Sequence, residues 1–145
     1  MKDMHSNIEV RHVFGPVVMT ADNTPAAIDR QGYESAELVI GVGIGGITFD
    51  ATDKVEFTLT HSDDDSTYAN VADVDMLGVS SITGGIIKSL IAAHAAAAKY
   101  RFGYVGNKRY LKLLANFSGT HVTGTPISVE WIFGNPSVAP IADAA

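Results

Sequence analysis

The chain has 145 residues, a formal net charge of −6 and no cysteine. This length suits one domain with a single core, and the lack of cysteine excludes disulfides, thiolate metal sites and cysteine nucleophiles. The acidic balance disfavours direct nucleic-acid binding, which needs clustered cations. The N-terminus is charged where a signal peptide would be apolar, and the longest weakly polar run, residues 82–98, is too short and too polar to span a bilayer. We therefore expect synthesis in the cytoplasm and no membrane contact.

Alternation of apolar and polar residues with a period of two predicts most of the elements. In chain order, the first predicted strand covers residues 13–20, where Gly15 and Pro16 mark a bend or a sheet edge. Later segments have one apolar and one polar face, as in residues 127–133, where Trp131 points into the predicted core. Such strands are typical of antiparallel sheets that share a core. The other clear strands are predicted at residues 37–44, 55–60, 100–105 and 111–117, with weaker candidates at 70–77 and 86–91.

These short, two-faced strands predict an all-β fold, a single-domain antiparallel β-sandwich or jelly roll. We assign residues 9–136 to this domain, residues 1–8 to an N-terminal tail and residues 137–145 to a C-terminal tail, both extended. Residues 92–98 are rich in alanine, the best helix former, but seven residues make only a marginal helix. They predict a short helical turn or an ordered loop.

The most informative stretch is residues 100–115, which read YRFGYVGNKRYLKLLA. Gly106 and Asn107 tolerate positive φ, so this stretch predicts a tight β-hairpin whose second strand carries cations on one face. Aromatic and basic side chains together suit a protein interface, where tyrosine and arginine are favoured. Stacking on nucleic acid bases and a merely solvated face are the alternatives. The predicted interface residues of this hairpin are Tyr104, Lys108, Arg109 and Tyr110.

The sharpest acidic cluster is the loop formed by Asp63, Asp64 and Asp65. Three carboxylates could bind calcium, but the spacing is not that of an EF-hand. A hairpin loop whose Asp and Ser side chains bond to their own backbone is the simpler interpretation. The loop also resembles the aspartate box of carbohydrate-binding β-sandwiches, with Tyr68 where tryptophan or phenylalanine is usual. We add the three aspartates to the candidate interface, because they could meet the basic strands across a subunit boundary.

No catalytic motif is present in the sequence. The five histidines show neither metal-ligand spacing nor an HExxH motif, and no G-x-S-x-G elbow frames a serine. The glycine-rich residues 41–46 lack the G-x-G-x-x-G spacing of a dinucleotide site. We therefore predict a protein that is not an enzyme and has no cofactor.

The phrases D-x-Q-G-Y-E-S at residues 29–35 and G-Y-V-G-x-K-R-Y at residues 103–110 resemble small structural proteins of tailed bacteriophages and prophages. The resemblance extends over residues 13–140. It implies a virion location and a capsid decoration, or cement, protein that binds the major capsid protein or another virion protein as a dimer or trimer. A neck or tail component, and a carbohydrate-binding module of a phage appendage, are the alternatives.

Overall fold

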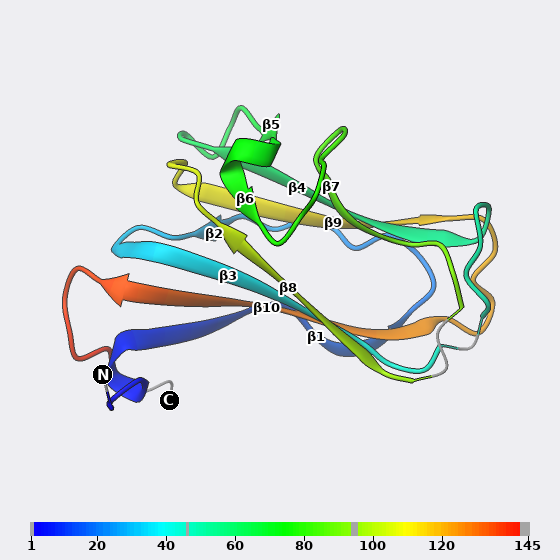
Figure 1. Cartoon of the computed structure of the whole chain (residues 1–145), viewed down its shortest axis with the longest axis horizontal. Coiled ribbons are helices and arrows are strands. Elements are labelled where there is room, and N and C mark those ends of the chain that lie inside the picture. Colours follow the sequence, from blue (N-terminus) through cyan, green and yellow to red (C-terminus); the bar gives the residue numbers. More distant parts are fainter. Residues whose placement is uncertain (1, 46, 94–95, 143–145) are drawn as a thin grey trace.

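The computed structural model describes residues 2–45, 47–93 and 96–142. Its strands form two antiparallel five-stranded sheets that pack face to face as a β-sandwich, which confirms the predicted fold class. Figure 1 shows the sheet that contains β4 and β9 above the sheet that contains β3 and β10. In the first sheet, sheet A, the order is β1 (Ile8–Met19), β10 (Thr125–Pro136), β3 (Tyr33–Val42), β8 (Ala98–Tyr104) and β6 (Met76–Leu77). In the second, sheet B, the order is β2 (Ile28–Asp29), β9 (Tyr110–Ser118), β4 (Lys54–Ser62) and β5 (Ala69–Asn70), with β7 (Ile86–Leu90) also paired to β4.

The core lies between the sheets and is made by the apolar faces that the alternation predicts. Trp131 of β10 is fully buried and stacks on Phe133, with ring centroids 5.9 Å apart. Every second residue of β3, β4, β9 and β10 points inward, because successive side chains of a strand lie on opposite faces. The largest fully buried side chains are Trp131, Phe57, Phe133, Leu38, Ile40, Leu59, Leu111, Leu113, Ile127, Val42, Val55 and Val129.

Strand β1 forms one edge of sheet A, as Gly15 and Pro16 predict. Its register with β10 shifts between His12 and Phe14 and again between Phe14 and Val17. Proline cannot donate a hydrogen bond to a strand ladder and is found at edges and bulges. The irregular part of β1 therefore contains Gly15 and Pro16, the two residues that predict it.

The predicted hairpin at residues 100–115 is wrong. Strand β8 belongs to sheet A and pairs with β3 and β6, whereas β9 belongs to sheet B and pairs with β2 and β4. The intervening residues 105–109 cross from one sheet to the other, and neither Gly106 nor Asn107 has a positive φ. Gly106 is required for a different reason: a Cβ there would lie 2.5 Å from the Tyr104 hydroxyl.

The crossing segment is held by backbone and side-chain donors from elsewhere in the chain. The amides of Val105 and Gly106 donate to the Asp75 carbonyl oxygen over 2.8 and 3.2 Å. The Arg30 guanidinium donates to the carbonyl oxygens of Lys108 (2.6 Å) and Gly106 (2.9 Å). These contacts replace the ladder bonds that a hairpin would supply.

The described part of residues 92–98 contains no helical turn, so of the two expected conformations the helical turn is wrong. Residues 92, 93, 96 and 97 have no regular structure, and Ala98 already belongs to β8, where it pairs with Val42. His94 and Ala95 lie outside the described residues. The described helical segments are two single 3₁₀ turns, His5–Asn7 and Asp73–Asp75. None of the described helical segments has the length and apolarity of a membrane span.

Candidate interaction surface

The acidic loop is a locally bonded turn, as the sequence predicts. The Asp64 carboxylate accepts hydrogen bonds from the amides of Ser66 (2.9 Å) and Thr67 (2.8 Å) and from the Ser62 hydroxyl (2.8 Å). These donors favour the ionised form, and they lower the pKa of Asp64 to about 2. Asp64 therefore organises the turn.

The other two aspartates of the loop pair with cations of the same chain. Asp63 binds the Lys108 ammonium, and Asp65 lies 3.6 Å from the Lys112 ammonium. The pairing follows from the ladder between β4 and β9, which ends beside the acidic loop. The acidic and basic segments thus meet within one chain and neutralise each other there, in place of a contact across a subunit boundary. Because both salt bridges are exposed to solvent, each contributes about 0–1 kcal/mol to the stability of the fold.

Tyr104 is buried, with 2% of its surface exposed, so its assignment to a surface interface is wrong. Its hydroxyl lies 2.9 Å from Nδ1 of the buried His61 and accepts a hydrogen bond from the Lys108 amide over 3.2 Å. Burial raises the pKa of Tyr104 and lowers that of His61. The pair fixes the crossing segment against β4 and has a structural role.

Lys108, Arg109 and Tyr110 are partly exposed and remain candidate contact residues. The Arg109 guanidinium donates to both carboxylate oxygens of Asp29 over 2.9 and 2.7 Å, and it lies 4.9 Å from the centroid of the Tyr110 ring. This fork-to-fork pairing lowers the pKa of Asp29. The sequence separates Asp29 from Arg109 by 80 residues, so spacing alone could not reveal the pair.

The described residues contain no group of three or more His, Asp or Glu side chains placed to hold a metal ion. In the acidic loop, backbone amides and lysine ammonium groups already bind the carboxylate oxygens. His94 lies outside the described residues.

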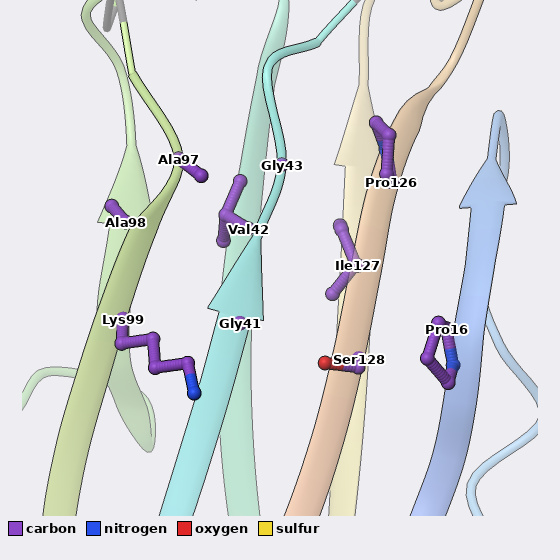
Figure 2. A pocket seen from close by; sticks show the side chains of 10 residues that line it. All are labelled: Pro16, Gly41, Val42, Gly43, Ala97, Ala98, Lys99, Pro126, Ile127 and Ser128. Carbon is purple, nitrogen blue, oxygen red and sulfur yellow. The ribbon is translucent and has the colours of Figure 1, made fainter.

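Sequence reasoning missed a hollow of about 370 Å³ on sheet A. Gly41 is paired with Lys99 on one side and Ser128 on the other, and Figure 2 shows both side chains turned toward it. The absent side chain leaves the space: a Cβ on Gly41 would lie 2.8 Å from the Ser128 hydroxyl, and one on Gly43 would lie 2.9 Å from Pro126. The alternation Gly41-Val42-Gly43 is the signal, because it puts glycine at two successive outward positions where β3 ends.

The same outer face carries exposed apolar side chains. Val10 and Val18 of β1 are 52% and 59% exposed, and Leu77 of β6 is 59% exposed. Lys99 is the charged residue that lines the hollow. Elsewhere on this face, Arg101 lies 3.0 Å from Glu37, and Glu130 lies 3.4 Å from His12. The outer face of sheet A therefore combines exposed apolar side chains with charges of both signs, which suits contact with another protein.

No protein-family model and no curated protein matches this sequence. Among solved structures, the chain is similar to the SPBc2 prophage-derived protein YomS, with a TM-score of 0.52 and 10% sequence identity over 89% of this chain and 94% of that chain. A chain from a structure of Bacillus endospore appendages, described as disulfide-linked pili, aligns over 90% of both chains with 14% identity and a TM-score of 0.37, which is too low to support an argument. The similarity to YomS shows a shared fold.

Proposed function

We propose that this chain is a structural component of a tailed-phage virion, and specifically a capsid decoration protein. The observation that carries the proposal is the fold similarity to a prophage-derived protein over 89% of this chain. The phage-like phrases at residues 29–35 and 103–110 add support from the sequence. In the structure these two phrases lie together, because Arg109 binds Asp29 and Arg30 holds the carbonyls of Lys108 and Gly106.

We propose the outer face of sheet A as the surface that binds the major capsid protein. A protein interface of standard size buries about 800 Å² on each partner, which is about a tenth of the 7988 Å² of accessible surface on this chain. A sheet face can supply that area, and the hollow at Gly41 would take a protruding apolar side chain of the partner. The role needs no catalysis, so we propose a protein that acts by contact alone.

Co-sedimentation with purified phage heads that lack this chain tests the proposed contact. We expect the wild-type protein to sediment with heads, and Val18→Lys and Leu77→Lys to bind at least about tenfold more weakly, because a charge would enter an apolar contact. Val138→Lys is the matched control, since Val138 is 78% exposed and follows β10, outside the strands of sheet A.

Failure of the wild-type protein to bind heads would contradict the decoration role. Binding to purified necks or tails in the same assay would support the alternative position in the particle. We also propose a dimer or trimer, and light scattering of the purified protein measures its mass directly; a monomer at every concentration tested would contradict that part.

A further inference from the structure

A second hollow, of about 380 Å³, lies on the outer face of sheet B. Its floor is set by the strand register: Thr60 of β4 pairs with Asn70 of β5 and with Lys112 of β9, and Thr58 pairs with Leu114. Successive outward side chains of neighbouring strands therefore form a floor that mixes hydroxyl, amide, ammonium and apolar groups. Tyr68 and Pro25 complete the lining.

Tyr68 is fixed in place by the acidic loop. The turn organised by Asp64 leads into Asp65, which has a positive φ of 55°. Asp65 accepts a hydrogen bond from the Tyr68 hydroxyl, and its carboxylate also lies 3.6 Å from the Lys112 ammonium. That ammonium is 3.9 Å from the centroid of the Tyr68 ring. The aromatic ring is therefore oriented before any ligand arrives, which lowers the entropic cost of binding.

Pro25 is held by the segment that covers the edge of β9. The Asn23 side chain binds the backbone of β9 as a neighbouring strand would. Its amide donates to the Leu113 carbonyl over 3.0 Å, and its oxygen accepts from the Ala115 amide over 2.7 Å. Pro25 follows two residues later and lines the same hollow as Leu114. Both the aromatic and the proline parts of the lining thus rest on hydrogen-bonded supports.

Two polar side chains of the hollow have no protein partner among the described residues. Neither the Thr58 hydroxyl nor the Asn70 side-chain amide forms a hydrogen bond to the described part of the chain. Lys112, the one cation among the described lining residues, is already compensated by Asp65. The site therefore offers apolar surface and uncharged hydrogen-bonding groups, and the nearby carboxylates of the loop would repel phosphate.

We propose that this hollow is a binding site for a neutral pyranose, the ring form of a hexose unit in a glycan. A pyranose has an apolar face of C–H groups, which fits Tyr68, Pro25 and Leu114, and a rim of hydroxyls, which fits Thr58, Thr60 and Asn70. Such a site would attach the protein to a carbohydrate surface, whatever its position in a particle. It lies on the sheet opposite the proposed capsid contact, so the two sites are separable.

Saturation-transfer-difference NMR tests the site with the methyl glycosides of glucose, galactose, mannose and N-acetylglucosamine. We expect at least one glycoside to receive saturation from the protein. In the spectrum of the protein, the same glycoside should shift the backbone amide signals of Tyr68, Asn70 and Lys112. Asn70→Ala and Tyr68→Ala should weaken that binding at least about tenfold. Tyr68→Phe keeps the ring but loses the hydrogen bond to Asp65, so it should weaken binding less than Tyr68→Ala does.

Asn116→Ala is the matched control for Asn70→Ala. Asn116 lies on the same outer face of β9, opposite Glu56 and outside the hollow, so its variant should bind like the wild type. The proposal is overturned if none of the four glycosides binds, or if folded Asn70→Ala binds as tightly as the wild type. Asn70 is exposed, so this second outcome remains measurable even if Tyr68→Ala fails to fold.

Discussion

Replacing Arg30 should destabilise the fold far more than replacing a typical surface arginine. Its guanidinium donates to the carbonyl oxygens of Lys108 over 2.6 Å, Gly106 over 2.9 Å and Tyr33 over 3.3 Å. It also lies 5.3 Å from the centroid of the Tyr104 ring. These bonds hold the segment that carries the chain from sheet A to sheet B.

The expected magnitude follows from the two shorter bonds. A hydrogen bond to a charged group contributes about 1.5–3 kcal/mol, and the lower end applies because the site is partly exposed. Arg30→Ala should therefore lower the free energy of unfolding by about 3 kcal/mol. Arg30→Lys keeps the charge but loses the forked donor geometry, so about half of that loss should remain.

Urea denaturation followed by tryptophan fluorescence measures both variants, since Trp131 is the single tryptophan and is buried. Arg101→Ala is the matched control. The Arg101 side chain is 81% exposed, and its ion pair among the described residues is with Glu37, so its loss should cost about 0–1 kcal/mol. If Arg30→Ala costs no more than Arg101→Ala, the guanidinium does not secure the crossing and the reasoning fails.

Three further predictions concern the turn, a glycine and the core. The folded-state pKa of Asp64, about 2, lies below its ordinary value of 3.8. Its carboxylate therefore stabilises the fold above about pH 4 and loses that effect as the pH falls toward 2. The difference in unfolding free energy between wild type and Asp64→Asn, measured by urea denaturation, should shrink over this range, and a constant difference would contradict the prediction. Gly119→Ala should cost about 1–3 kcal/mol more than Gly84→Ala in the same assay. Both glycines have positive φ, but a Cβ on Gly119 would lie 2.1 Å from an Asp53 carboxylate oxygen, whereas Gly84 faces open space; equal costs would refute the steric argument. Trp131→Ala should cost about 3–5 kcal/mol, monitored by circular dichroism, and a loss below about 1 kcal/mol would place the indole outside the core.

The strands could be predicted from the sequence because alternation reports directly on the two faces of a sheet. The segments around Leu38, Phe57 and Trp131 all became strands with the predicted inward face. The same alternation also predicts that the Tyr104 side chain is buried. It shares a face with Phe102, whereas Arg101 and Lys99 point the other way, and that pattern puts Tyr104 in the core.

Alternation does not report which sheet a strand joins. A Gly-Asn pair between two strands favours a hairpin on local grounds, yet β8 and β9 separate because Arg30 and the Asp75 carbonyl bind the segment between them. These contacts join residues that are 30 to 78 positions apart, and no local rule predicts them. The hollow on sheet B was hidden for the same reason, since Pro25 and Tyr68 meet only after β9 and β4 have paired.

Cryo-electron microscopy of the parent phage particle tests the central claim most directly. We predict density for this β-sandwich on the head surface, with the outer face of sheet A against the major capsid protein and the β4–β9 face directed away from it. Purified heads in which mass spectrometry finds the other head proteins but not this chain, and whose maps lack this density, would contradict the account.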